Sequence, residues 1–189
     1  MWLLTQVLTE ILNQFHNLLT TLGLQNKQAK IVFLGLDNAG KSTLLRRLTS
    51  GRLAALQPTF QPHSETVTMG GVAFTTFDLG GHTQARRLWA SYAVETQGLV
   101  FIVDTADHER FAEAAAELKG MLDLEALHGV PFVVLGNKTD RVGAVNEAEL
   151  RGALGVYNGY RDRDVGVFMC SVVLGEGYKE AIRWLAARV

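Results

Sequence analysis

The sequence predicts an α/β fold in which a mostly parallel, six-stranded sheet is flanked by helices. Short apolar runs typical of buried strands alternate along the chain with segments of helical periodicity. The first such strand leads into a glycine-rich motif that opens a helix, and this strand–loop–helix unit is typical of parallel sheets that bind phosphate. The 189 residues, 48% of them hydrophobic, suffice for one domain with an N-terminal appendage.

The first element is an N-terminal amphipathic, membrane-binding segment at residues 1–26, ahead of a folded domain at 27–189 with a hinge at 26–28. Polar residues interrupt the apolar residues of this segment too often for it to span a bilayer, which needs about 20 mostly apolar residues. The segment also lacks the features of a signal peptide. Trp2 replaces the glycine that N-myristoylation needs. Its apolar face could insert into lipid, which we favour, or dock on the domain itself. The apolar residues that recur with helical period are Leu4, Leu8, Ile11, Leu12, Phe15, Leu18, Leu19 and Leu22.

The remaining elements follow in a regular order. We expect strands at 31–35, 65–69, 72–78, 99–104, 132–137 and 167–171, and helices at 42–50, 109–122, 147–154 and 177–188. Gly70 and Gly71 permit the dihedrals of a tight turn, so the second and third strands should form a hairpin and make one sheet edge antiparallel.

Residues 35–42 read G-x-x-x-x-G-K-S, the phosphate-binding loop of nucleotide-binding proteins. We expect Lys41 to reach the β- and γ-phosphates and to take part in catalysis, and the Ser42 hydroxyl to bind Mg²⁺. A chance glycine-rich turn is the alternative, but the flanking strand and helix disfavour it. The residues expected to surround the phosphates are Asp37, Asn38, Ala39, Gly40, Lys41, Ser42 and Thr43.

The motif N-K-x-D at 137–140 follows another buried strand and specifies the base. The Asp140 carboxylate only accepts hydrogen bonds, and guanine offers an N1–H and an amino group side by side, whereas adenine has a bare acceptor at N1. Asn137 can tie the base edge to the phosphate loop, and the stem of Lys138 can pack on the ring. A solvated turn is the alternative for an isolated match, but the position at a strand's carboxyl end favours a GTP or GDP site.

Residues between these motifs suggest a switch that responds to the γ-phosphate. Asp78 opens a D-x-x-G motif at a strand end and is placed to hold Mg²⁺. The Gly81 amide could sense the γ-phosphate. Thr59, in a polar loop, is the candidate that adds a hydroxyl to Mg²⁺ only with triphosphate, although it could be an ordinary loop threonine.

Several segments together resemble the Sar-type small GTPases, of the Arf/Sar branch of the Ras-like superfamily. The segments that carry the resemblance are 35–41, 77–82, 84–89, 104–110 and 168–172. The resemblance implies a P-loop NTPase with a Ras-like G domain. It also implies a soluble GDP form and a GTP form that inserts the N-terminal helix in the endoplasmic reticulum membrane. There the family recruits coat protein complex II for transport to the Golgi apparatus.

The resemblance also implies partners and further site residues. An exchange factor in the endoplasmic reticulum membrane, for which residues 1–4 could be a hydrophobic handle, would load GTP, and inner coat subunits would stimulate hydrolysis. His82 stands where related GTPases carry a water-orienting glutamine, so we expect it to orient water, although a solvated loop histidine is the alternative. Ser171 and Val172 match the segment whose backbone amides contact the guanine carbonyl. Asp37 belongs to the nucleotide and metal site in similar proteins.

Some points of the sequence limit or qualify this interpretation. A carboxylate at Asp37 should repel phosphates, so we expect backbone amides to satisfy it or Mg²⁺ to lie near it. No arginine is clearly placed to act on the γ-phosphate, so we predict slow intrinsic hydrolysis and an arginine supplied by a partner. The segment 151–166 is shorter than the insertion usual in Sar-type proteins, which puts contacts made by that loop in doubt.

Composition and rival functions complete the sequence-based analysis. The net charge of −1 gives no footprint for nucleic acid, and the single cysteine, Cys170, suits a reducing cytosol. A P-loop small-molecule kinase would need an acceptor site and a lid, and a scaffold with inert nucleotide would not need the complete set of site residues. A closer alternative is an Arf-like GTPase that acts at another membrane.

Overall fold

A computed structural model describes residues 27–50, 63–69, 72–78, 86, 89–157, 160–161, 163 and 165–189. Its six strands form one sheet in the order β2-β3-β1-β4-β5-β6. The strands are β1 (Lys27–Leu34), β2 (His63–Met69), β3 (Val72–Asp78), β4 (Gly98–Asp104), β5 (Phe132–Asn137) and β6 (Val165–Met169). The α-helices are α2 (Lys41–Ser50), α4 (Trp89–Ala93), α5 (Phe111–Leu122), α6 (Glu147–Leu154) and α7 (Tyr178–Ala186), with 3₁₀ turns at His108–Arg110 and Glu125–Leu127.

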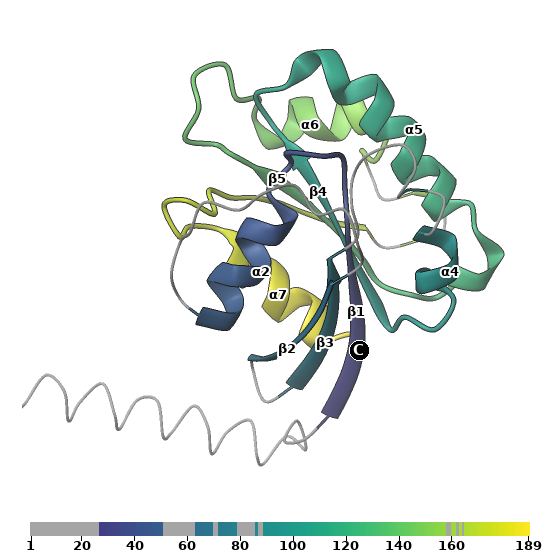
Figure 1. Cartoon of the computed structure of the whole chain (residues 1–189). Helices are drawn as coiled ribbons and strands as arrows, with labels where there is room; N and C mark the ends of the chain where they lie inside the picture. Colours follow the sequence, from purple (N-terminus) through teal and green to yellow (C-terminus); the bar gives the residue numbers. More distant parts are fainter. Residues whose placement is uncertain are drawn as a thin grey trace, which may run out of the picture.

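The sheet is parallel except at one edge (Figure 1). Strand β1 pairs in parallel with β3 on one side and with β4 on the other, and β4–β5 and β5–β6 are also parallel. Only β2 runs antiparallel, and it pairs with β3 along its whole length from His63 to Met69. The predicted fold class and the antiparallel edge are therefore confirmed, although the turn at Gly70 and Gly71 lies outside the described residues.

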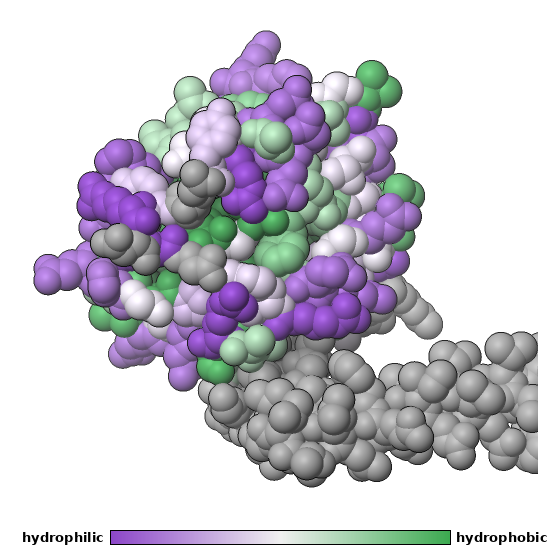
Figure 2. Space-filling view, turned by 180° about the vertical axis from the view of Figure 1, so that it is seen from behind, coloured by the Kyte–Doolittle hydropathy of each residue, from purple (hydrophilic) through white to green (hydrophobic). Residues whose placement is uncertain are grey.

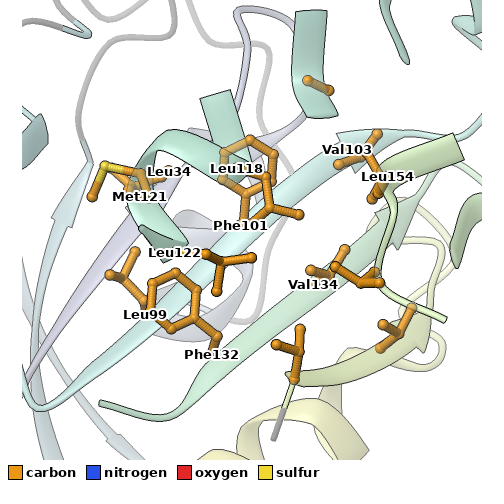
Figure 3. Close-up of a cluster of buried hydrophobic side chains, with 14 of the residues drawn as sticks. Leu34, Leu99, Phe101, Val103, Leu118, Met121, Leu122, Phe132, Val134 and Leu154 are labelled. Carbon is orange, nitrogen blue, oxygen red and sulfur yellow. The ribbon is translucent and has the colours of Figure 1, made fainter. Parts of the chain in front are cut away.

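Alternate side chains of the central strands point to opposite faces, as the pleat of a strand requires. In β4, Leu99, Phe101 and Val103 join the core cluster under α4, α5 and α6, whereas Val100 and Ile102 join the cluster under α2 and α7. Figure 3 shows the first cluster, in which Leu118, Met121 and Leu122 reach from α5 toward the strands. Because both faces are covered, these strands are apolar at consecutive positions rather than at every second one.

Each layer of helices covers one face of the sheet (Figure 1). Helix α6 begins with a capping box, in which the Asn146 side chain accepts from the Glu149 N–H and Glu149 returns the contact to the Asn146 N–H. It ends at Gly155, whose left-handed φ of 72° suits a residue without a Cβ. These local signals explain why the prediction of a helix at 147–154 is correct.

Several predicted boundaries differ from the observed ones. Strand β1 begins at Lys27, because Lys27 and Gln28 pair with Val72 and Ala73 of β3, so the predicted hinge at 26–28 is wrong for these residues. Because Lys27 and Gln28 are polar, the sequence does not show a strand pattern at these positions. Backbone pairing with β3 nevertheless extends the strand over them. Strand β6 occupies Val165–Met169 rather than 167–171, and the short helix α4 was not predicted.

Figure 2 shows one face of the molecule, on which mainly hydrophilic side chains surround a hollowed area where hydrophobic residues gather. Among the described residues, the large hydrophobic side chains that are exposed are Val94, Val142, Tyr157, Val173 and Leu174. Within the described part of the chain, no helix has the length and apolar character needed to cross a membrane. The predicted amphipathic segment at 1–26 lies outside the described residues.

Candidate functional site

The carboxyl ends of the parallel strands bring the predicted motifs to one edge of the sheet, where ligands of α/β sheets bind. The phosphate loop follows β1, the N-K-x-D motif follows β5, and residues 170–172 follow β6. Register aligns these ends, since Asp104 of β4 is opposite Asn137 of β5 and Asp78 of β3 is opposite Phe33 of β1. Segments more than a hundred residues apart in sequence thus line one site.

The phosphate loop has the backbone of an anion-binding turn. Gly35, Asn38 and Gly40 all have positive φ values, of 137°, 60° and 105°, and left-handed residues of this kind are common in the backbone concavities that bind anions. Helix α2 begins directly afterwards at Lys41, so the positive end of its dipole faces the loop. Lys41 is only 6% exposed, and its ammonium donates to the carbonyl oxygens of Gly35 at 2.8 Å and Leu36 at 2.9 Å.

The Asn137 side chain joins the phosphate loop to the loop after β6. Its amide nitrogen donates to the Ala39 carbonyl at 2.9 Å, and its oxygen accepts from the Val172 N–H at 3.1 Å. Its backbone carbonyl accepts from the Thr105 hydroxyl at 2.9 Å. A Cβ added at Gly40 would collide with the Asn137 amide, which explains why a glycine stands there.

Lys138 is held by an acidic residue for which the motifs gave no role. Its ammonium lies 2.7 Å from Asp104 Oδ2, and the side chains are 14% and 8% exposed. The other carboxylate oxygen of Asp104 accepts from the Ala106 N–H at 3.1 Å, and Arg141 approaches Oδ2 at 3.4 Å. The pair fixes Lys138, whose φ is 69°, at the edge of the expected base site.

Asp140 is exposed and lies beside the loop after β6, as a base-binding carboxylate should. One of its oxygens accepts from the Ser171 hydroxyl, which in turn accepts from the Leu174 N–H at 3.1 Å. The backbone amides predicted to meet the guanine carbonyl both have protein acceptors, since Ser171 N–H donates to Glu176 and Val172 N–H to Asn137. A bound base would therefore have to share the Val172 amide with Asn137.

Cys170 lies behind this loop and is 2% exposed. Its sulfur is 3.7 Å from Asn137 Oδ1, and its backbone N–H donates to the Gly136 carbonyl at 2.8 Å. Burial, with a smaller contribution from the charge of Asp140, raises the pKa of the thiol to about 12. The thiol is therefore protonated at neutral pH, and the side chain packs in the core.

Asp37 is satisfied by a partner that the sequence did not indicate. Its Oδ1 accepts from Arg110 at 2.8 Å and its carbonyl accepts from the same guanidinium at 3.3 Å, so a cation adds to the backbone hydrogen bond that the sequence led us to expect. This hydrogen bond is the main reason why the pKa of Asp37 is lowered. The pair joins residues 73 positions apart, and no motif spacing signals such a contact.

The remaining predicted residues are placed in part. Ser42 and Thr43 are half-buried in the first turn of α2, and the backbone of Asp78 ends β3. Thr59, Gly81 and His82 lie outside the described residues. Among the side chains that the structure describes, no group of three or more His, Cys, Asp and Glu could hold a metal ion by itself. Asp104 could have been found from sequence, because it ends a buried strand at the carboxyl edge of the sheet.

Comparison with known proteins agrees with this geometry. The model of the ADP-ribosylation factor family matches residues 15–189. The small COPII coat GTPase SAR1 of Giardia intestinalis is 41% identical over 182 residues, which cover 91% of this chain and 95% of the relative. That of Nicotiana tabacum is 40% identical over 193 residues, covering 93% and 97%.

Other members of the family are also similar. ADP-ribosylation factor 1 of Brassica rapa subsp. pekinensis is 37% identical over 161 residues, covering 85% of this chain and 88% of the relative. A solved structure of the Arl6 BBS3 small GTPase from Trypanosoma brucei, with bound nucleotide analogue GppNp, has a TM-score of 0.78 and 32% identity, covering 86% of this chain and 99% of that one. The chain therefore belongs to the ADP-ribosylation factor family of small GTPases, in its Sar-type branch.

Proposed function

We propose that this chain is a GTP-hydrolysing switch that recruits coat protein complex II to the endoplasmic reticulum in its GTP form. The observation that carries the proposal is the Asn137 side chain, which joins the phosphate loop to the loop after β6 in one polar network. Both relatives named SAR1, at 41% and 40% identity, are small COPII coat GTPases, and this supports the assignment of the coat.

Base recognition rests on Asn137, Lys138 and Asp140, with Ser171 and Val172 opposite them. Asp140 would accept from the guanine N1–H and amino group, while the Ser171 hydroxyl holds the carboxylate in place. Lys138, fixed at 2.7 Å by Asp104, would present its aliphatic stem to the ring face. Adenine would place an acceptor against the carboxylate, so the site should discriminate strongly against ATP.

The phosphates would lie on the turn from Asp37 to Thr43, where positive φ values and the start of α2 orient amides toward an anion. On binding, the Lys41 ammonium would exchange its carbonyl partners in the loop for phosphate oxygens. Hydroxyl and carboxylate oxygens suit Mg²⁺, and Ser42, Thr59 and Asp78 are the residues that would hold it. We place Asp37 beside the phosphates rather than on the metal ion, because the Arg110 guanidinium that binds its carboxylate would compete with Mg²⁺. Bound Mg²⁺ would neutralise charge on the phosphates.

Hydrolysis would depend on positioning water rather than on a strong base. His82 would orient the attacking water through a ring nitrogen, and the Gly81 amide would contact the γ-phosphate. A partner arginine typically accelerates such a reaction by about 10³–10⁵-fold, so the chain alone should be slow. Inner coat subunits would supply that stimulation, and an exchange factor in the endoplasmic reticulum membrane would load GTP.

Residues 1–26 would form the membrane-binding segment, and residues 27–189 the G domain. The segment would insert its apolar face in the cytosolic leaflet when GTP is bound and leave the protein in the cytosol when GDP is bound. The alternative is an Arf-like GTPase that acts at another membrane. The 37% identity to an ADP-ribosylation factor is the specific observation in its favour.

Liposome flotation of the full chain loaded with GDP or GppNp tests the switch. We expect recruitment with GppNp only, loss of recruitment in Leu8→Glu on the apolar face, and normal recruitment in Asn13→Glu, which adds the same charge to the polar face. Equal recruitment with both nucleotides would contradict nucleotide gating. Adding inner coat subunits to the GppNp liposomes separates the alternatives, because a GTPase of another membrane would not retain them.

A further inference from the structure

A chain of alternating charges links the phosphate loop to helix α5 and to Arg86. Arg110 donates from its terminal nitrogen to Asp37 and from Nε to Glu113, both at 2.8 Å. The other Glu113 oxygen accepts from Arg86 at 2.7 Å, and Arg86 also donates to Glu117 at 2.9 Å. We call these residues the α5 ion-pair chain.

Asp37 is the point at which this chain meets the nucleotide site. It stands inside the phosphate loop, between Gly35 and Gly40, with a side chain that is 52% exposed. A lone carboxylate there would repel bound phosphates, and more strongly a triphosphate than a diphosphate, because the triphosphate carries the larger negative charge. Arg110 is the counter-charge that makes the acid compatible with an anion site.

Arg86 is the other end of the chain and is more deeply buried. Its side chain is 8% exposed and is held by carboxylates on successive turns of α5. In sequence it lies between Asp78, the last residue of β3, and Trp89, the first residue of α4. Its ion pairs therefore attach Arg86, which follows D-x-x-G in the sequence, to α5. Trp89 is 1% exposed and packs edge-on against Phe101, so its environment reports on this region.

Glu113 couples Arg110 to Arg86, because each of its carboxylate oxygens accepts from a different one of these arginines. A planar guanidinium can bridge two carboxylates, and the pKa of Glu113 is lowered by hydrogen bonds from Arg110 first and Arg86 second. Phosphate charge next to Asp37 would attract Arg110 more strongly with triphosphate than with diphosphate. Glu113 would then interact mainly with Arg86, and the attachment of Arg86 to α5 would tighten.

We propose that Arg110 is a positioning residue that neutralises Asp37 beside the bound nucleotide and, through Glu113, makes the attachment of Arg86 to α5 depend on the γ-phosphate. This inference rests on the proposed function, since it needs guanine nucleotide on the phosphate loop. It adds to that function a route from the phosphate loop to Arg86 that uses α5 rather than the metal ligands.

The first test compares dissociation constants of the full chain for GDP and GppNp. We expect Arg110→Ala to weaken GppNp binding about ten-fold more than GDP binding, because Asp37 is left uncompensated. Adding Asp37→Asn to Arg110→Ala should restore both affinities to within about three-fold of wild type, a rescue that a merely structural arginine would not allow. Glu117→Gln, which contacts Arg86 but not Arg110, is the matched control and should leave the ratio of affinities unchanged.

Equal weakening of both nucleotides by Arg110→Ala, without rescue by Asp37→Asn, would overturn the proposal. If Arg110→Ala does not fold, Asp37→Asn alone decides the point, since it leaves Arg110 unopposed and should strengthen GppNp binding relative to GDP. An unchanged ratio in that variant would also refute the inference. A wild-type chain that binds neither nucleotide would instead refute the proposed function.

The second test follows Trp89 fluorescence in a chain with Trp2→Phe and Trp184→Phe. Exchange of GDP for GppNp should change the signal, and Glu113→Gln should remove at least half of that change because it breaks the link between the arginines. Glu117→Gln should retain most of it. A Glu113→Gln variant with the full nucleotide-dependent change would show that the α5 ion-pair chain carries no coupling.

Discussion

The contact between Asp104 and Lys138 allows a quantitative prediction about nucleotide retention. Replacing Asp104 by Asn keeps the shape of the side chain but removes its charge. The ammonium of Lys138, 2.7 Å away and only 14% exposed, then loses its ionic partner while Arg141 remains nearby. We expect Lys138 to leave its position at the base site, so GDP should dissociate faster.

The size of the expected effect on GDP dissociation follows from how deeply the Asp104–Lys138 pair is buried. Removing one member of a buried ion pair typically costs about 3–5 kcal/mol. Lys138 is partly exposed, and the asparagine oxygen can still accept one hydrogen bond, so we expect about 1.5–3 kcal/mol of the binding free energy to be lost. This corresponds to about 10-fold to 150-fold faster dissociation of GDP, if the association rate is unchanged.

The assay is the dissociation rate of fluorescent GDP after addition of excess unlabelled GDP at constant Mg²⁺. Arg141→Ala is the matched control, because its side chain is 54% exposed and lies 3.4 Å from the same oxygen, so its rate should stay within about two-fold of wild type. Lys138→Ala should be as fast as Asp104→Asn, and the double variant no faster. Additive effects, or a normal rate in Asp104→Asn, would refute the reasoning.

Further predictions concern backbone, capping, thiol reactivity and pH. Gly40→Ala should abolish nucleotide binding through its clash with Asn137, whereas Gly120→Ala, with open space around it in α5, should raise the free energy of unfolding by about 0.5–1 kcal/mol in chemical denaturation. Asn146→Ala should lower that free energy by about 1 kcal/mol, because the α6 capping box is lost; an unchanged midpoint would contradict the cap. Cys170, with its pKa raised to about 12, should resist iodoacetamide at pH 8 until the protein unfolds, and rapid alkylation of the native protein would contradict its burial. The lowered pKa of Asp37 stabilises the fold above about pH 4, and this contribution is lost as the pH falls through the folded-state pKa. Asp37→Asn should therefore reduce the pH dependence of stability in acid, measured by urea unfolding, and an unaltered acid profile would argue against the ion pair.

The sequence predicted the elements whose signals are local. The apolar runs at β4 and β5, the helix at 147–154 and the phosphate loop all have signals within a few neighbouring residues, and the structure agrees with them. The start of β1 escaped prediction because Lys27 and Gln28 are polar and are held in a strand by pairing with β3, which lies far along the chain.

The candidate site divides in the same way. Motif spacing was enough to predict that Lys41, Asn137 and Asp140 lie at one edge of the sheet. It could not indicate Arg110, whose partner Asp37 is 73 residues away, because long-range ion pairs leave no periodicity in sequence. It also gave no reason to expect that the Val172 amide would already be engaged by a protein acceptor.

The position of Asn137 between the two halves of the site has a consequence for ligands smaller than a nucleotide. Because one amide group binds both the Ala39 carbonyl and the Val172 N–H, ordering of either loop helps to order the other. Guanosine and pyrophosphate, which each fill one half, should therefore bind cooperatively, and each should bind more tightly when the other is present. Asn137→Ala would remove this mutual assistance and leave two weak, independent subsites, a difference that calorimetric titration of one fragment in the presence of the other can measure.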